Sequence, residues 1–316
     1  MDSDRRSDHS CFQSITATPE EIVFSWSFEQ LVFALFEPKA KDFSEYVTFH
    51  EYGRSLRAEL TEQLEVSKIL FAPPLAALQS LSATLCLYDH HWAYYNQLVM
   101  SYACFFQDEA KFFEYIEQQI FYAGARNALN PNTLPAISAL INLCALNFDF
   151  STHLSLLKVF SQQESELPCF ASALIGALSS QMLKKRLPEI GPWIDTFSRL
   201  RIKEQCRKYQ PHLRIECPPG FDVNPPIDLK SLVISQKIAE SVGNQYEPFS
   251  ATYALMLSIE KELQAHGLYP TYEFYLVGTL HGLGLYPNWI VAWTTFAQLP
   301  IGIAQYLQIL HNPATT

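Results

Sequence analysis

The stretch from Gly267 to Gln308 decides the fold of this chain, and it reads GLYPTYEFYLVGTLHGLGLYPNWIVAWTTFAQLPIGIAQYLQ. It contains the triplet Glu273-Phe274-Tyr275 and, eight residues later, the turn-like segment Leu283-Gly284-Leu285-Tyr286-Pro287. The aromatic residues that follow recur at helical spacing: Trp289, Trp293, Phe296 and Tyr306. We expect such a set to lie in the core or in a subunit interface.

The rest of the chain also has the pattern of helices punctuated by prolines. It has only 11 glycines and no run of strictly alternating polar and apolar residues, which argues against a large sheet. Apolar residues recur at helical spacing from Leu134 to Cys144 and again from Phe249 to Leu263. The segment Cys217–Ile227 holds four prolines and a glycine, so it is expected to be a loop between two helical blocks. The sequence predicts an all-α protein.

The C-terminal stretch resembles the end of a citrate synthase. In that family an Asp-Phe-Tyr triplet precedes a helix, a Leu-Gly-Ile-Pro-like turn follows, and a last helix carries an arginine and ends Gly-Trp-x-Ala-His. The same frame here holds Glu273-Phe274-Tyr275, the turn from Leu283 to Pro287, then Gln298, and finally Ile301-Gly302-Ile303-Ala304-Gln305. The apolar and glycine positions are kept, whereas the polar positions are not.

Two N-terminal segments extend the resemblance. Phe43–Gly53, FSEYVTFHEYG, fits the family's early helix of the type Phe-Glu-Glu-x-Ala-x-Leu-Leu-x-x-Gly. Pro74–Asp89, PLAALQSLSATLCLYD, fits the helix that begins Pro-Met-x-x-Leu-Arg and ends Leu-Tyr-Asp. The resemblance implies an all-α, citrate-synthase-like fold: a large helical domain from 19–179 and 263–316, with a small helical domain at 180–262 inserted into it. Residues 1–18 are polar and poor in aliphatic side chains, so we expect a mobile N-terminal arm.

Composition and charge indicate the cellular compartment and exclude some classes of partner. Seven cysteines without a CxxC pair indicate reduced thiols, and no apolar run follows the charged N-terminus as in a secretory signal. The apolar stretches are soon interrupted, so we expect no membrane span. The net charge of −10 argues against nucleic-acid binding. Neighbouring His90 and His91 point in different directions on a helix, and we expect no metal site. Cytoplasmic localisation is the expectation.

Glu273 is the candidate catalytic base. Making citrate requires a carboxylate that removes a proton from the methyl group of an acetyl thioester, and a hydrogen-bond donor on the thioester oxygen. The resemblance places Glu273 where the family has its aspartate, so the carboxylate is kept on an arm one methylene longer. A base displaced by about 1 Å loses on the order of a hundredfold in rate.

The other catalytic positions implied by the resemblance are lost. The family's Gly-Pro-x-His-Gly-Gly loop follows a small-residue helix, here Pro168–Ser180, but Gln181-Met182-Leu183-Lys184-Lys185-Arg186 comes next. A lysine could donate a hydrogen bond to an enolate oxygen only from a rebuilt loop. Leu146 and Val223 stand at two further histidine positions, Gln298 replaces the arginine of the last helix, and the chain stops at Thr316, before a further arginine-bearing tail. We therefore expect no ordinary citrate synthesis.

Two functions remain open. In the first, the fold is kept while the site has decayed, and the chain is a pseudoenzyme that acts as a partner or regulator. In the second, the cleft is rebuilt for a divergent acyltransferase that condenses an acyl-CoA with an unknown 2-oxo acid, with Glu273 as base. The resemblance also implies a dimer, either with itself or with an intact citrate synthase homologue.

A basic run bears on the choice between these functions. The segment from Lys184 to Arg214 contains nine basic and three acidic residues, so its local net charge is +6 (nine minus three). Coenzyme A carries phosphates, and family members bind it largely through the small domain, where this run would lie. The candidate coenzyme A contacts are Lys184, Lys185, Arg186 and Arg207. The alternative is that these charges form solvated helix faces or a surface for an acidic partner.

Overall fold

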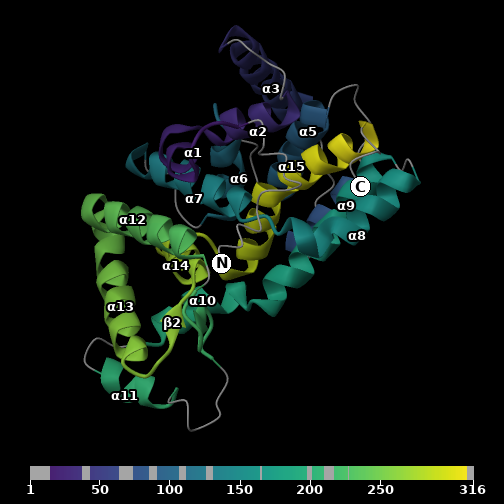
Figure 1. The fold of residues 1–316 in the computed structure, drawn as a ribbon. Coiled ribbons are helices and arrows are strands. Elements are labelled where there is room, and N and C mark those ends of the chain that lie inside the picture. The colour runs from purple at the N-terminus through teal and green to yellow at the C-terminus, as the bar shows by residue number, and fades with distance from the viewer. Residues whose placement is uncertain are drawn as a thin grey trace.

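The computed structural model describes residues 15–37, 43–63, 74–84, 91–106, 112–125, 131–163, 166–197, 201–209, 217–226 and 228–311. In these residues the chain is almost entirely helical (Figure 1), which confirms the predicted all-α class. The α-helices are α1 (Pro19–Ser25), α2 (Phe28–Phe36), α3 (Phe43–Gln63), α4 (Pro74–Thr84), α5 (His91–Phe106), α6 (Ile116–Gly124), α7 (Leu134–Leu146), α8 (Phe150–Gln162), α9 (Leu167–Lys184), α10 (Leu187–Asp195), α11 (Ile202–Arg207), α12 (Leu229–Gln245), α13 (Glu247–Gln264), α14 (Tyr272–Gly282) and α15 (Ile290–His311). Short 3-10 helices are η2 (Pro131–Thr133) and η4 (Pro287–Trp289).

A two-residue strand pair supplies the sheet structure of the described chain. Strand β1 (Phe221–Asp222) runs antiparallel to β2 (Tyr269–Pro270), with Phe221 opposite Pro270. Strand β1 lies inside the proline-rich segment that the sequence predicts to be a loop, and the described residues around it form turns and bends. The pair anchors this segment directly before α14, because Thr271 N–H also donates to the carbonyl of Gly220 at 2.9 Å.

Local sequence sets several helix starts. Thr18 and Glu21 form a reciprocal capping box at α1, and Ser27 and Gln30 form another at α2. At α12 the carboxylate of Asp228 accepts from the backbone of Ser231. The predicted N-terminal arm lies outside the described residues up to position 14, while Ile15 packs against the core.

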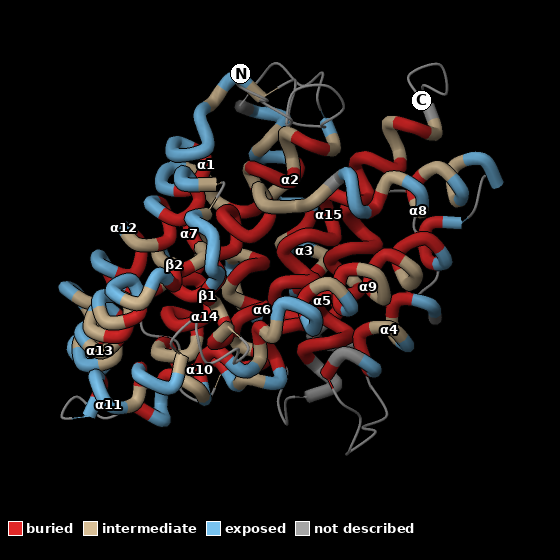
Figure 2. The backbone as a smooth tube through the Cα atoms, turned by 60° about the horizontal axis from the view of Figure 1, so that its bottom comes forward, coloured by how far each residue is buried: buried red, intermediate tan, exposed pale blue. Residues whose placement is uncertain are grey.

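The core is built around α15, which packs against α7, α8 and α9. Figure 2 shows the buried backbone running through the centre of the molecule, with exposed turns at its edges. The aromatic residues of α15 lie inside, where Tyr306 stacks on Phe170 at 4.2 Å between ring centroids. Gly302 lets α9 approach, since a Cβ added there would lie 2.2 Å from the side chain of Leu174.

The two N-terminal segments singled out in the sequence fall on helices. Phe43–Gly53 forms the first half of α3, and Gly53 lies under the indole of Trp92, which a Cβ would meet at 2.5 Å. Pro74–Asp89 begins with α4 up to Thr84, and its remaining residues lie outside the described chain. The small residue at position 53 is therefore needed for α3 to pack on α5.

A second group of helices packs around α14. Helices α10, α12 and α13 all contact α14, and α11 packs on α13. In Figure 1, α11, α12, α13 and β2 lie at one end of the molecule, and α3, α5, α8, α9 and α15 at the other. The division into domains at 19–179, 263–316 and 180–262 remains a proposal. Within the described residues no single helix is long and apolar enough to cross a membrane, although the bent pair Pro131–Leu146 and Ser151–Gln162 passes that test together.

Candidate functional site

Glu273, the candidate base, lies in the first turn of α14 and pairs with Lys185. The two residues are joined by a 2.7 Å contact between Lys185 Nζ and Glu273 Oε1. The Glu273 side chain is 9% exposed and that of Lys185 is 41% exposed. The carboxylate is therefore sheltered, and the lysine reaches it from the solvent side. The structure thus brings together two residues that the sequence analysis assigned to different roles.

The turn between α9 and α10 presents Lys185. Lys184 ends α9 with an exposed side chain, and Arg186 follows in the left-handed conformation with φ of 57°. A non-glycine residue in this region is strained, so the surrounding contacts must hold it. Arg186 donates to Glu189 from Nε at 2.9 Å and from Nη2 at 2.6 Å, and to the carbonyl of Cys217 at 3.2 Å. The resemblance expects the family's His-Gly-Gly loop at this turn.

Tyr272 completes the immediate surroundings of the ion pair. The ammonium of Lys185 lies 5.8 Å from the centre of its ring, within the range of a cation–π contact. Burial raises the pKa of the Tyr272 hydroxyl well above its ordinary value, and the charge of Glu273 raises it further. Cys144 and Asp228 raise the same pKa by smaller amounts. The sequence analysis did not identify Tyr272, because tyrosine before a Glu-Phe-Tyr triplet is not distinctive.

Cys144 of α7 and Gln298 of α15 are two buried residues that contact each other. Cys144 is 1% exposed, and burial raises the pKa of its thiol, while nearby Lys185 lowers it. Gln298 is also 1% exposed, and its Nε2 donates to the carbonyl of Cys144 at 3.1 Å. Gln298 therefore connects two core helices. It occupies the position at which the resemblance expects a ligand-binding arginine.

The junction of α7 and α12 adds polar groups that the sequence analysis missed. The hydroxyl of Ser231 lies 3.0 Å from Asn147 Oδ1 and also hydrogen bonds the carboxylate of Asp228. Asn147 directly follows Leu146, the residue at one of the lost histidine positions. A helix-capping pattern at Asp228 was the only signal in the sequence, and capping alone does not indicate a site.

His153 is buried beside this region but makes a structural contact. Its Nε2 lies 3.3 Å from Gln181 Oε1, and burial lowers the pKa of the imidazole. Gln181 precedes Lys185 by four residues, so both lie on one face at the end of α9. The cap of α8 is Asp149, whose Oδ1 accepts from Thr152 N–H at 3.3 Å.

The candidate coenzyme A contacts do not form one cluster. Lys184 is exposed, Lys185 pairs with Glu273, and Arg186 pairs with Glu189. Arg207 ends α11 and borders an open groove of about 630 Å³. That groove is lined by Arg201, Ile202, Lys203, Glu204, Arg207, Ser258, Lys261 and Glu262. Their assignment to coenzyme A stays a prediction. In the described part of the chain, no group of three or more His, Cys, Asp or Glu side chains could hold a metal ion.

Comparison with known proteins identifies the fold. No family model matches the sequence, and no curated protein matches it either. Solved structures do match. Citrate synthase from Pyrobaculum aerophilum superposes with a TM-score of 0.63 at 13% identity, covering 93% of this chain and 82% of the other. Citrate synthase from Thermotoga maritima MSB8 gives a TM-score of 0.66 at 14% identity, covering 92% of this chain and 83% of the other.

A third match carries ligands. The citrate synthase of the thermophilic archaeon Thermoplasma acidophilum, in a ternary complex with carboxymethyl coenzyme A and oxaloacetate, gives a TM-score of 0.68 at 13% identity. The match covers 92% of this chain and 84% of the other. These similarities extend over nearly the whole chain, and they show that it has the citrate synthase fold. They confirm the expectation drawn from the three sequence segments.

Proposed function

Because this chain has the citrate synthase fold, we propose that it is a pseudoenzyme that acts as a partner or regulator and does not make citrate. The observation that carries the proposal is the ion pair of Lys185 with Glu273 at 2.7 Å. A catalytic base must offer its carboxylate to a carbon acid, and here one carboxylate oxygen already holds an ammonium group. To act as a base, Glu273 would first have to give up this partner inside a sheltered site.

The loss of the other polar groups supports the same proposal. Gln298 is buried and bonded to the backbone of α7, so it offers no charge to a substrate carboxylate. Two carboxylates of a 2-oxo diacid need bidentate partners such as arginine. Leu146 and Val223 stand at the two remaining histidine positions and can neither donate nor accept a proton.

The experiment that tests inactivity is a steady-state assay of coenzyme A release from acetyl-CoA and oxaloacetate. We expect release at the rate of the sample without protein, and a catalysed, oxaloacetate-dependent release would overturn the proposal. A separate experiment tests whether the chain still binds coenzyme A. It measures acetyl-CoA binding by calorimetry, on the wild-type chain and on a variant with Lys184, Lys185 and Arg186 changed to alanine. Binding lost in the variant would support a coenzyme A sensor, whereas no binding would support a role through protein partners.

The second candidate function is a divergent acyltransferase acting on an acyl-CoA and a 2-oxo acid. The observation that favours it is that a donor and a carboxylate meet at the place where the family keeps its donor and base. If a substrate separated the pair, the Lys185 ammonium could stabilise an enolate oxygen while Glu273 accepted the proton. Activity with any acyl-CoA and 2-oxo acid that Glu273→Gln abolished would favour this function, and activity unchanged in that variant would exclude Glu273 as base.

A dimer is the proposed assembly, formed with itself or with an intact citrate synthase homologue. Helix α9 packs on α4 and carries a run of small residues, Ala171, Ser172, Ala173 and Ala177, that allow close helix approach. Light scattering of the purified chain gives its mass, and co-expression with a citrate synthase from the same cells tests the mixed dimer. We propose a cytoplasmic location, with no nucleic-acid or membrane partner.

A further inference from the structure

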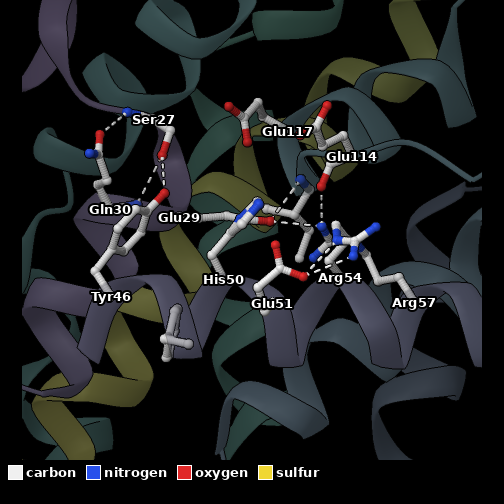
Figure 3. A network of polar contacts seen from close by, with 12 residues as sticks. Ser27, Glu29, Gln30, Tyr46, His50, Glu51, Arg54, Arg57, Glu114 and Glu117 are labelled. Carbon is white, nitrogen blue, oxygen red and sulfur yellow. Dashed lines mark hydrogen bonds and ion pairs between the residues drawn. The ribbon is translucent and has the colours of Figure 1, made fainter. Parts of the chain in front are cut away.

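A buried cluster of ionisable side chains lies far from the Lys185–Glu273 pair, where α2, α3 and α6 meet. Its centre is Glu29 of α2 and Arg57 of α3, both 0% exposed, with Arg57 Nη2 2.9 Å from Glu29 Oε1. Figure 3 shows His50 and Arg57 converging on Glu29 from α3. Removing charges from water is unfavourable, so a buried group of this kind needs a specific reason to persist.

Glu29 connects three helices at once. Its Oε1 accepts from the backbone N–H of Ile116 at 3.1 Å, at the start of α6, which has no side-chain cap of its own. Its Oε2 hydrogen bonds Nδ1 of His50. Arg57 adds hydrogen bonds of 2.6 Å to Asn96 Oδ1 on α5 and 2.5 Å to the carbonyl of Glu114. Helix α3 is thus held to the body by polar contacts as well as by its apolar face.

A second carboxyl group, that of Glu117, lies beside this centre in the first turn of α6. It is 2% exposed, and its Oε1 accepts from the hydroxyl of Ser138 at 2.8 Å. Its Oε2 is buried without a hydrogen-bond partner in the described residues. Burial, and after it the charge of Glu29, raise the pKa of Glu117 to about 7. Glu117 therefore keeps a proton far above the ordinary range of a glutamate.

The other groups that act on this carboxyl come from every helix around it. Hydroxyls and charged groups that interact with Glu117, Glu29 or His50 are Tyr46, Glu51, Arg57, Tyr95, Tyr115 and Ser138. Ser27, Arg54 and Glu114 act in turn on Tyr46, Arg57 and Tyr115, respectively. Among the described residues of the cluster, Arg57 is the only permanent cation. One guanidinium can balance one carboxylate, and the second carboxylate is balanced only if His50 is protonated.

We propose that this cluster is a proton-binding site that controls how firmly helix α3 is docked on α2 and α6. With protons bound at Glu117 and His50, the buried carboxylate of Glu29 lies between the cations Arg57 and His50 and faces no second anion. When both protons leave, two carboxylates share one guanidinium in a site closed to water. Undocking of α3 then relieves the repulsion, because it admits water to the carboxylates.

The direction of the pH dependence follows from the two titrating groups. Both have raised pKa values in the docked state, since burial acts on Glu117 and the hydrogen bond to Glu29 acts on His50. A raised pKa means that docking is fully supported below the ordinary values of 4.5 and 6.5, and that this support is lost as pH rises through the raised values. Docking of α3 should therefore weaken between about pH 5 and pH 8.

Amide hydrogen exchange measured at pH 6 and pH 8, corrected for intrinsic rates, tests the proposal. We expect the protection of α3 to fall by about tenfold or more at pH 8, with α14 unchanged. Glu117→Gln keeps the shape of a protonated carboxyl, so the loss of protection of α3 at pH 8 should be much smaller than in the wild type, with the remainder due to His50. The matched control is Glu45→Gln, an exposed change on α3 that should keep the wild-type dependence.

The outcomes separate cleanly. Equal protection of wild-type α3 at the two pH values would overturn the proposal, and so would a pH dependence in Glu117→Gln as large as in the wild type. If Glu117→Gln fails to fold, the proposal is still tested by the wild-type protein, in which the protection of α3 at pH 6 and pH 8 is compared with that of α14. A His50→Gln variant that loses only part of the pH dependence would support a shared role of both groups.

Discussion

Lys185 Nζ lies 2.7 Å from Glu273 Oε1, although the two residues are 88 positions apart in the sequence. The contact links the turn after α9 to the first turn of α14. In the assignment proposed above, Glu273 is the candidate base, and the cation that pairs with it comes from the turn at which the resemblance expects the oxygen donor.

Breaking this pair should destabilise the protein modestly. Lys185→Met leaves the sheltered carboxylate of Glu273 without its cation, but the lysine is 41% exposed and the pair is screened by water. We expect a loss of about 1 kcal/mol in the free energy of unfolding, measured by urea titration. Glu273→Gln in the Lys185→Met background should restore part of it. Additive losses in the double variant would show that the two side chains do not interact.

The left-handed turn at Arg186 gives a second prediction. Arg186→Ala and Arg186→Gly both remove the contacts to Glu189 and Cys217, but only glycine adopts a φ of 57° without strain. The glycine variant should therefore be more stable than the alanine variant by about 1 kcal/mol. Thermal unfolding of the two variants side by side gives the difference. Equal melting temperatures would mean that the turn relaxes when the side chain is lost.

Most of the fold could be predicted from the sequence, because the residues that set helix packing are still recognisable. Gly53 and Gly302 let helices approach where a Cβ would lie 2.5 and 2.2 Å from Trp92 and Leu174, respectively. Such positions tolerate no side chain, so they persist while the polar positions change. The structure matches citrate synthases over more than nine-tenths of its length at 13 to 14% identity.

The polar arrangements could not be predicted in the same way. The sequence indicated a lysine in place of the donor, but its contact with Glu273 depends on the left-handed turn at Arg186, and arginine does not signal that conformation. Arg54 and Arg57 are three residues apart in α3, yet the first is exposed and the second is fully buried. Helical spacing alone does not say which charged residue faces a buried carboxylate.

That contrast between two arginines of α3 is itself testable. Arg57→Met removes the guanidinium, the only permanent cation among the described residues around Glu29 and Glu117, and leaves buried carboxylates uncompensated. The expected loss is about 3 to 5 kcal/mol in the free energy of unfolding. Arg54→Met removes an exposed partner of Glu51 and should change stability by less than about 0.5 kcal/mol. Chemical denaturation at pH 7 measures both, and similar losses would contradict the assigned burial.

Gln298 offers the sharpest test of whether the catalytic site could be restored. Gln298→Arg returns the arginine that the resemblance expects in the last helix. Its side chain, however, is 1% exposed and donates to the carbonyl of Cys144 between α15 and α7. A guanidinium there would be larger and without a carboxylate partner, so we expect a loss of about 3 kcal/mol or more. Gln298→Leu, which removes the hydrogen bond but adds no charge, should lose less stability and serves as control.

Thermal unfolding and the coenzyme A release assay are both measured on each variant. An arginine variant with wild-type stability and new oxaloacetate-dependent release of coenzyme A would show that the side chain at position 298 lies in the substrate cleft and not in the core. This result would contradict the burial of Gln298, on which the proposed inactivity partly rests.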